Sequence, residues 1–160
     1  MSTYEKLLFM HFVFVALLVG GEGVATATGI GMSRTSDTRT IEMLARLSSK
    51  AEYLALIPGA LGTIVTGTWL VDELAYLEFE QGWLTASYVI WAVATAIGTF
   101  VLGPHARRVA RRAKELRENG VGESEELHAE ASKRLIAMLG MLQLVFILAL
   151  LWLMTAKPGL

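Results

Sequence analysis

The stretch from Leu135 to Ala156 reads LIAMLGMLQLVFILALLWLMTA and contains no charged side chain. As a helix it is long enough to cross the hydrocarbon core of a bilayer, which needs about 20 apolar residues. Three further stretches, at residues 7–32, 53–71 and 83–103, have a similar composition. Because backbone polar groups in lipid must bond to one another, each stretch is predicted to be a helix. We therefore expect an all-α membrane protein, an antiparallel bundle of four transmembrane helices.

The composition of the whole chain agrees with this architecture. Hydrophobic residues make up 54% of its 160 residues, charged residues make up 18%, and the mean hydropathy is +0.50. A soluble domain of this length is more polar and carries no such spans. Residues 1–160 are therefore expected to form a single transmembrane domain.

The residue types also exclude several kinds of chemistry. The chain has no cysteine, which excludes disulfides, thiolate catalysis and iron–sulfur clusters. It has no glycine-rich phosphate loop, nucleophile elbow or metalloprotease motif. Its most basic segment carries nearly as many acids and no interleaved aromatic residues, which argues against nucleic-acid binding. The sequence indicates no particular reaction, and a role other than an enzyme is favoured.

Positive charge lies in two of the three segments that connect the spans. Of the 14 Lys and Arg residues, four lie between the first two spans, eight lie between the last two, and none lies between the middle pair. The positive-inside rule places the two basic connections in the cytoplasm. We therefore predict a multi-pass protein of the bacterial cytoplasmic (inner) membrane with both termini external.

The third connection is predicted to be a basic helical hairpin that extends helices 3 and 4. Residues 106–118 favour a helix, Asn119-Gly120 favours a turn, and Ser124 is expected to cap the next helix. Arginines at the membrane end of this hairpin are expected to contact anionic lipid headgroups, which contribute about 1 kcal/mol per basic residue near the surface. These residues are Arg107, Arg108, Arg111 and Arg112.

Small residues recur at helical spacing in the first two spans. Gly59, Thr63 and Gly67 lie four apart in the second span, and Gly21 and Gly29 belong to a similar stripe in the first. Lipid supplies no hydrophobic drive between helices, so close backbone approach has to hold them together. We expect the first two spans to pack most closely. An alternative use of one stripe is a contact with a second copy of the chain or with a membrane-complex partner.

His11 is one of two ionisable residues inside the first span. Three roles are open for it: an axial haem ligand, a metal ligand, or a hydrogen-bonding group that packs helices. The other two histidines lie at the cytoplasmic end, so they do not converge with it. Met154 lies near the same membrane surface, and together with Met10 and His11 it resembles a soft copper site. Haem b and copper are therefore the cofactors that we consider at His11.

Glu22 lies deeper in the same span. A carboxylate at that depth costs about 2.5–3.5 kcal/mol on insertion scales unless it is protonated or paired. Thr63, Thr95 and Gln143 fall at a similar level and are its expected hydrogen-bond partners. A neutral Glu22 bonded to Gln143 or to a threonine would be structural. The alternative is a functional polar site for a proton, a cation or a ligand.

Three places along the chain carry a resemblance to a known family. They are His11 with Gly20-Gly21, Pro58 with TGTWLV at residues 66–71, and WLMTAKP at residues 152–158. In these places the chain resembles the bacterial integral membrane proteins grouped as domain of unknown function 2269. The resemblance implies a four-helix bundle in the inner membrane and implies little about activity.

More distantly, such bundles look like copper-resistance D-type proteins and haem-linked protoporphyrinogen oxidase-like membrane proteins, which also place a histidine in an early helix. By analogy, this resemblance implies a cofactor at His11. Glu22 and the small residues after it depart from the family's pattern, so no role for Glu22 carries over. Three classes of function remain open. They are a cofactor- or metal-binding protein that uses His11, which we favour, a transport component for protons, cations or small solutes that uses Glu22, and a structural or assembly subunit.

Overall fold

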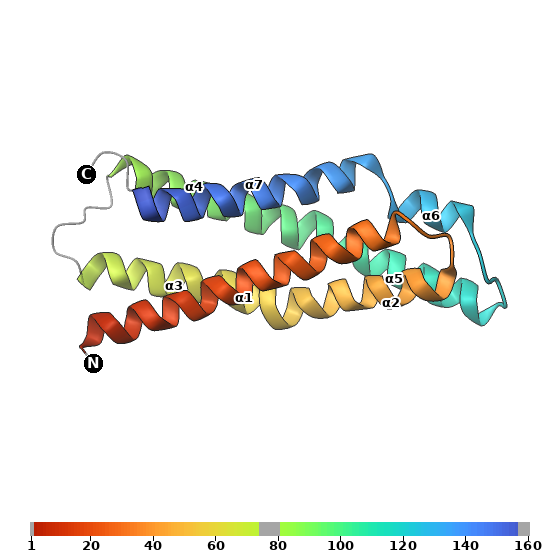
Figure 1. Cartoon of the computed structure of the whole chain (residues 1–160), viewed down its shortest axis with the longest axis horizontal. Helices are drawn as coiled ribbons and strands as arrows, with labels where there is room; N and C mark the ends of the chain where they lie inside the picture. The colour runs from red at the N-terminus through yellow and green to blue at the C-terminus, as the bar shows by residue number, and fades with distance from the viewer. Residues whose placement is uncertain (1, 74–80, 157–160) are drawn as a thin grey trace.

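The computed structural model of the chain describes residues 2–73 and 81–156, and the structural statements below concern these residues. They form α-helices and two short π-helical segments, with no β-strand among them (Figure 1). The elements in chain order are α1 (Thr3–Met32), α2 (Thr38–Ala51), η1 (Glu52–Leu56), α3 (Ile57–Glu73), α4 (Gly82–Ile97), η2 (Gly98–Leu102), α5 (Gly103–Glu118), α6 (Glu125–Ala131) and α7 (Arg134–Ala156). The predicted all-α fold is confirmed.

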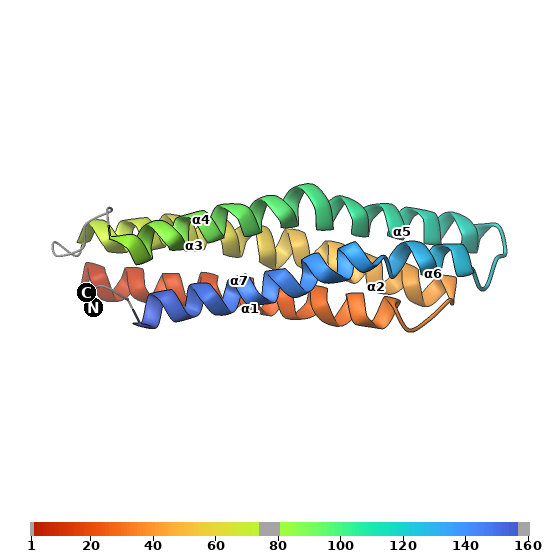
Figure 2. The same ribbon diagram turned by 90° about the horizontal axis from the view of Figure 1, so that it is seen from above.

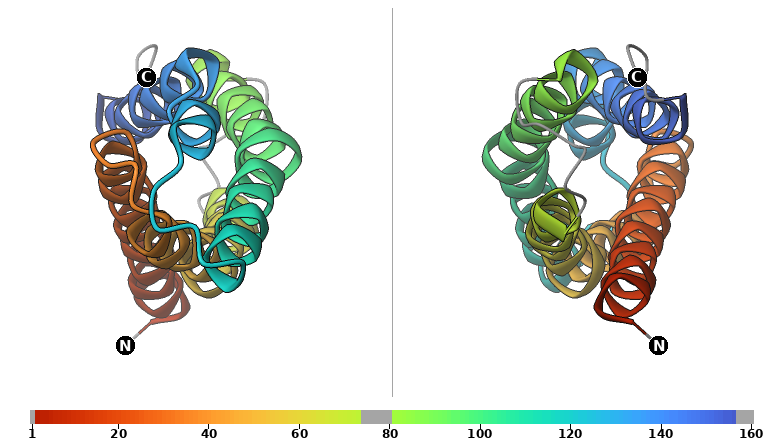
Figure 3. Two further views of the ribbon diagram at one scale, coloured as in Figure 1. Left: turned by 90° about the vertical axis from the view of Figure 1, so that its right-hand side faces the viewer. Right: turned by 90° about the vertical axis from the view of Figure 1, so that its left-hand side faces the viewer.

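Consecutive helices join into four long rods in the described residues, and each rod is long and apolar enough to cross a membrane. These rods run through Thr3–Met32, Thr38–Glu73, Gly82–Glu118 and Glu125–Ala156. Each predicted span lies within one of them. The rods lie side by side along the length of the molecule (Figure 2) and are arranged in a ring when seen end-on (Figure 3). The predicted four-helix membrane bundle is therefore confirmed.

The two ends of the bundle differ in composition. The start of α1, the end of α3, the start of α4 and the end of α7 lie together at one end, which we call the terminal end (Figure 1). The helices α2, α5 and α6 form the opposite end, which we call the basic end because it carries most of the Lys and Arg residues.

A π-helical segment followed by a proline connects each of the two middle spans to the basic end. The segment η1 ends two residues before Pro58, and η2 ends two residues before Pro104. A proline ring clashes with the carbonyl group four residues back and provides no N–H group. The wider π turn adds one residue to the ring of backbone atoms at that point, so the rod continues past the proline.

Glycines of α3 allow α1 to approach closely, as the sequence predicts for the first two spans. A Cβ atom on Gly59 would lie 2.7 Å from the backbone nitrogen of Leu18, and a Cβ on Gly62 would overlap the ring of Phe14. A Cβ on Gly21 of α1 would lie 3.0 Å from the side chains of Ala55 and Leu56 in η1. The packing of α1 against α3 is the most extensive in the described structure. The predicted pairing of the first two spans is confirmed.

The basic end has a hydrophobic core of its own. The predicted turn at Asn119 and Gly120 ends α5, where Gly120 has a φ of 78°, and Ser124 caps α6 by accepting a hydrogen bond from the N–H of Leu127. The structure adds that α2 packs along α5 and closes this core. The fully or nearly fully buried residues of the core are Met32, Ile41, Ala45, Val109, Ala113, Leu127 and Ala131.

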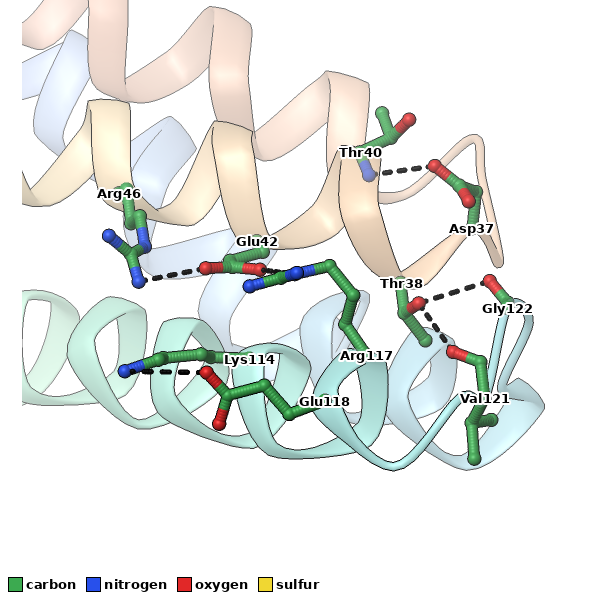
Figure 4. Close-up of polar contacts among 10 residues, drawn as sticks. All are labelled: Asp37, Thr38, Thr40, Glu42, Arg46, Lys114, Arg117, Glu118, Val121 and Gly122. Carbon is green, nitrogen blue, oxygen red and sulfur yellow. Dashed lines mark hydrogen bonds and ion pairs between the residues drawn. The ribbon is translucent and has the colours of Figure 1, made fainter.

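Charged and polar contacts tie α2 to α5 and to the chain that follows it (Figure 4). Arg117 donates to one carboxylate oxygen of Glu42 at 2.7 Å, and Arg46 lies 2.8 Å from the other. The Thr38 hydroxyl donates to the carbonyl oxygen of Val121 at 2.7 Å. The hydrogen bond from Arg117 holds the pKa of the Glu42 carboxyl below its usual value. We call Glu42, Arg46 and Arg117 the arginine–glutamate clamp.

Candidate functional site: an intramembrane cavity around His11

A cavity of about 270 Å³ lies among α1, α3, α4 and α7, towards the terminal end. Its wall is almost entirely apolar and includes the aromatic rings of Trp83, Tyr88 and Trp91. His11 of α1 and Thr63 of α3 are polar members of the wall. An apolar cavity with a few convergent polar groups is the usual form of a small-molecule site.

His11 enters this cavity because α3 leaves room for its ring. Its side chain is 8% exposed, which makes it one of the few buried residues of α1. A Cβ on Gly67 would lie 3.2 Å from Cε1 of the imidazole, so the ring packs directly against the bare backbone of α3. The neighbouring Thr66 places its hydroxyl oxygen 2.9 Å from Nδ1.

The hydrogen bonds of Thr66 favour one tautomer of the His11 ring. The Thr66 hydroxyl lies 2.6 Å from the carbonyl oxygen of Gly62, and a carbonyl oxygen can only accept. The hydroxyl proton is therefore used there, and Oγ1 accepts the hydrogen bond from His11. In the tautomer that these contacts favour, Nδ1 of His11 carries the hydrogen, and in a neutral imidazole Nε2 then has a free lone pair.

One polar group of the cavity wall, the hydroxyl of Thr63, is buried without a hydrogen bond to any described residue. A second, Nε2 of His11, makes no hydrogen bond with the described residues, whose contact with the ring is at Nδ1. The remaining polar groups are engaged: Ser87 donates to the carbonyl of Trp83 at 2.8 Å, and the hydroxyl of Tyr88 lies 2.9 Å from that of Thr68. Since buried polar groups are nearly always bonded, these two groups of one cavity are available to a ligand or to water.

Two residues of the cavity wall, one on α1 and one on α7, are exposed at the surface of the bundle. Phe12 of α1 belongs to the wall and is 62% exposed, and Thr155 of α7 is an exposed wall residue. This surface faces lipid if the apolar rods span a bilayer. The cavity is therefore lined in part by residues that also contact lipid.

The proposed copper ligands are only partly brought together. His11 and Met154 both line the cavity, whereas Met10 is 43% exposed and is not part of its wall. The described residues contain no group of three or more His, Asp or Glu side chains that could hold a metal ion. One nitrogen and one thioether sulfur are a sparse ligand set for copper. The cavity does not fit a closed copper site.

Haem fits poorly as well. Nε2 of His11 has the free lone pair that an axial ligand needs, and Met154 is available as a second ligand. However, pockets for drug-sized ligands have volumes of about 300–1,000 Å³, and a porphyrin would have to widen a cavity of about 270 Å³. None of the described wall residues is a Lys or Arg that could pair with the propionates.

Glu22 is buried, at 7% exposure, and lies outside the wall of the His11 cavity. No hydrogen bond in the described structure joins it to its expected partners. Gln143 instead donates to the carbonyl oxygen of Ala94 at 2.8 Å, and Thr63 lines the His11 cavity. Thr95 lies on α4 and is partly exposed. The hydrogen bonding of Glu22 to Thr63, Thr95 or Gln143 therefore stays a prediction.

Sequence reasoning missed Thr66 and Trp91. Thr66 lies between Thr63 and Gly67 in the sequence but is not part of the stripe of small residues four apart. Its role depends on which face of α3 meets His11, and that is a tertiary relation. Trp91 donates from its indole nitrogen to the carbonyl oxygen of Ala60 at 3.1 Å, which links α4 to α3 beside the cavity.

The fold and the cavity define a class: a four-span membrane protein with an intramembrane cavity. The family model described as "Predicted integral membrane protein (DUF2269)" matches residues 5–158. The chain therefore belongs to this family, as the motifs in the sequence indicate. No curated protein and no solved structure matches the chain.

Proposed function

We propose that this membrane protein binds a lipophilic small molecule in the His11 cavity and that His11 holds the polar end of that molecule. The observation that carries the proposal is an apolar cavity whose wall contains an imidazole nitrogen and a hydroxyl without partners in the described structure. Leaving such groups unpaired in an apolar medium costs about 1–3 kcal/mol each. A ligand that bonds to them recovers part of that free energy.

The position of the cavity supports a ligand that comes from the membrane. The wall is apolar and reaches the lipid-facing surface at Phe12, so a lipophilic molecule can enter without crossing water. Within the wall, the hydrogen bond from Thr66 orients the His11 ring in the way that outer partners orient functional histidines. Haem and copper remain testable occupants, although the size and the ligand set of the cavity favour a smaller organic molecule.

The test compares what the protein retains on purification with what a His11→Ala variant retains. Both proteins are extracted from membranes in mild detergent, and bound molecules are identified by mass spectrometry, a visible absorption spectrum and elemental analysis. We expect a lipophilic molecule near one per chain in the original protein and at least tenfold less in the variant. The control is His128→Ala, because His128 lies at the basic end and bonds to Thr35. Equal retention in all three proteins would refute the proposal.

A second candidate function rests on Glu22. This side chain is 7% exposed and has no hydrogen bond or ion pair with another described residue. An ionisable group inside a membrane span without a partner is by default a proton or cation site. The test is proton or cation flux into proteoliposomes, which Glu22→Gln should abolish. Identical flux from the variant, or none from either protein, would remove this candidate.

We also propose that the basic end faces the cytoplasm of a bacterial inner membrane, as the positive-inside rule indicates. Because the chain has no cysteine, single cysteines can report its orientation. Asn119→Cys at the basic end should be protected from a membrane-impermeant thiol reagent in intact cells. Ser2→Cys at the terminal end should be labelled. The reverse labelling pattern would mean that the basic end is external.

At the basic end, we now propose the anionic lipid contact for Arg108 and Arg111 only. Arg107 is 2.5 Å from Glu52, and Arg112 is 2.5 Å from Glu126. Arg108 and Arg111 are exposed and have no ion pair with a described residue. Replacing both with Gln should lower the amount of anionic lipid that co-purifies, and unchanged lipid content would argue against the contact.

A further inference from the structure

We propose that the ligand of the His11 cavity is a lipid-borne hydroquinone, bound through one of its hydroxyl groups. This inference rests on the proposed function and adds the chemical class of the ligand. It follows from three properties of the cavity: the hydrogen-bonding character of His11, the size of the space, and the route to the bilayer.

The hydrogen-bonding character requires a donor on the ligand. Thr66 uses its proton on Gly62, which makes Nδ1 of His11 the protonated nitrogen and Nε2 an acceptor. An acceptor in an apolar cavity pairs with an O–H or N–H group of the ligand. A ligand with a carbonyl oxygen at that position would instead place its lone pairs against the lone pair of Nε2. A hydroquinone presents a hydroxyl at this position, whereas the oxidised quinone of the same ring presents a carbonyl.

The wall provides few other polar contacts, so the ligand has few polar groups. The hydroxyl of Thr63 is the second unpaired group, and it can either donate or accept. The other polar side chains of the wall already bond within the protein, including Ser87 and Tyr88. A ring with two oxygens on opposite sides and an otherwise apolar body matches this wall. A sugar, a nucleotide or a peptide does not.

The size and the opening select a single ring with an apolar tail. A cavity of about 270 Å³ lies just below the range of about 300–1,000 Å³ for small-molecule sites, which favours a ligand with a single ring. The aromatic rings of Trp83, Tyr88 and Trp91 provide surfaces for offset or edge contacts with a ligand ring. An isoprenoid or alkyl tail can leave between α1 and α7, where Phe12 is exposed, and continue into lipid.

The experiment measures binding of one ring in its two redox states. The full-length protein is placed in lipid nanodiscs, and a decyl-tailed hydroquinone or its oxidised quinone is added at defined mole fractions under anaerobic conditions. The discs are captured, and the bound ligand is quantified by mass spectrometry against empty discs. We expect the hydroquinone to bind at least about tenfold more tightly than the quinone, which corresponds to one good hydrogen bond.

Thr66→Val tests the reason for this preference without removing a cavity side chain that contacts the ligand. Without the Thr66 hydroxyl, the proton of the His11 ring is free to move to Nε2, where it can donate to a quinone carbonyl. The preference for the reduced ring should fall to within about twofold or reverse. Thr28→Val is the matched control, since Thr28 is buried in α1 and donates to its own helix at Val24. It should leave the preference unchanged.

The outcomes separate the two proposals. If both redox states bind equally in the original protein and His11→Ala loses both, the hydroquinone assignment is wrong and the cavity function stands. If the Thr66→Val preference equals that of the original protein, the assigned acceptor role of Nε2 is wrong. If neither ring binds and no other lipophilic molecule is retained, both proposals fail.

Discussion

The basic end and the cavity region of this protein are built on opposite packing principles. At the basic end, Ile41, Val109 and Leu127 are 0% exposed, and the arginine–glutamate clamp ties α2 to α5. In the cavity region, four helices surround about 270 Å³ of space, and the hydroxyl of Thr63 in the wall is buried without a partner in the described structure. The first region is complete without a ligand, whereas the second would be completed by one.

This difference shows where the chain can carry a binding site without losing its fold. Close packing of α1 against α3 and the core at the basic end hold the helices in register. The pair formed by α4 and α7 packs less tightly against the pair formed by α1 and α3. The cavity lies between these two pairs. The side chains of its wall have no packing partner on the side that faces the cavity, and this loss of dispersion contacts is shared among several residues.

The largest expected effect comes from shortening a core residue at the basic end. Ile41→Ala should lower the free energy of unfolding by about 2–5 kcal/mol, because it leaves a void in closely packed surroundings. Ile64→Ala in the cavity wall is the matched variant and should cost less, since that side chain already borders empty space. Thermal unfolding in detergent measures both. Equal losses would mean that the two regions are packed alike.

A smaller loss is expected where α3 meets α1. Gly59→Ala places a methyl group 2.7 Å from the backbone nitrogen of Leu18, so the helices must move apart at a cost of about 1–3 kcal/mol. Gly20→Ala is the control, because a Cβ there meets nothing within 4 Å and alanine favours the helix. The unfolding temperatures of the two variants should change in opposite directions. A stable Gly59→Ala protein would contradict the close approach.

The smallest expected effect is electrostatic and depends on pH. The pKa of Glu42 is lowered in the folded protein by the hydrogen bond from Arg117. The stabilisation it provides is therefore complete above the ordinary value of 4.5 and is lost as the pH falls through the lowered pKa of the folded state. Glu42→Gln should unfold at a lower temperature than the original protein at pH 7. The difference should shrink steadily below pH 4.5, and a difference independent of pH would exclude this role.

Much of the fold is predictable because its causes are local. Apolar length sets the spans, Asn119-Gly120 sets the turn after α5, and Ser124 caps α6. The pairing of the first two spans is also predictable, since glycine at position 59 permits close approach and lipid provides no other drive. The packing of α2 along α5 in the core at the basic end is not predictable in this way, because it depends on how the second and third rods pack outside the membrane.

The candidate site is predictable only in part. His11 stands out because an ionisable residue in a span is rare, and the structure places it in a cavity with Met154. The grouping of Thr63 with Glu22 rests on counting residues from the helix ends, and this count does not give the register in which α3 packs along α1, where Gly59 meets Leu18 and Gly67 meets His11. The roles of Thr66 and Gly62 depend on individual hydrogen bonds, which no sequence pattern specifies.

The most direct measurement of the central claim is the protonation state of the His11 ring. Nitrogen-15 NMR of histidine-labelled protein in lipid distinguishes a protonated ring nitrogen from one with a free lone pair. The chain has only three histidines, so a His11→Gln variant assigns the signals. The account predicts a neutral ring with hydrogen on Nδ1 and a free lone pair on Nε2 that shifts when hydroquinone is added. Hydrogen on Nε2, or an Nε2 signal that does not respond to any lipophilic ligand, would contradict it.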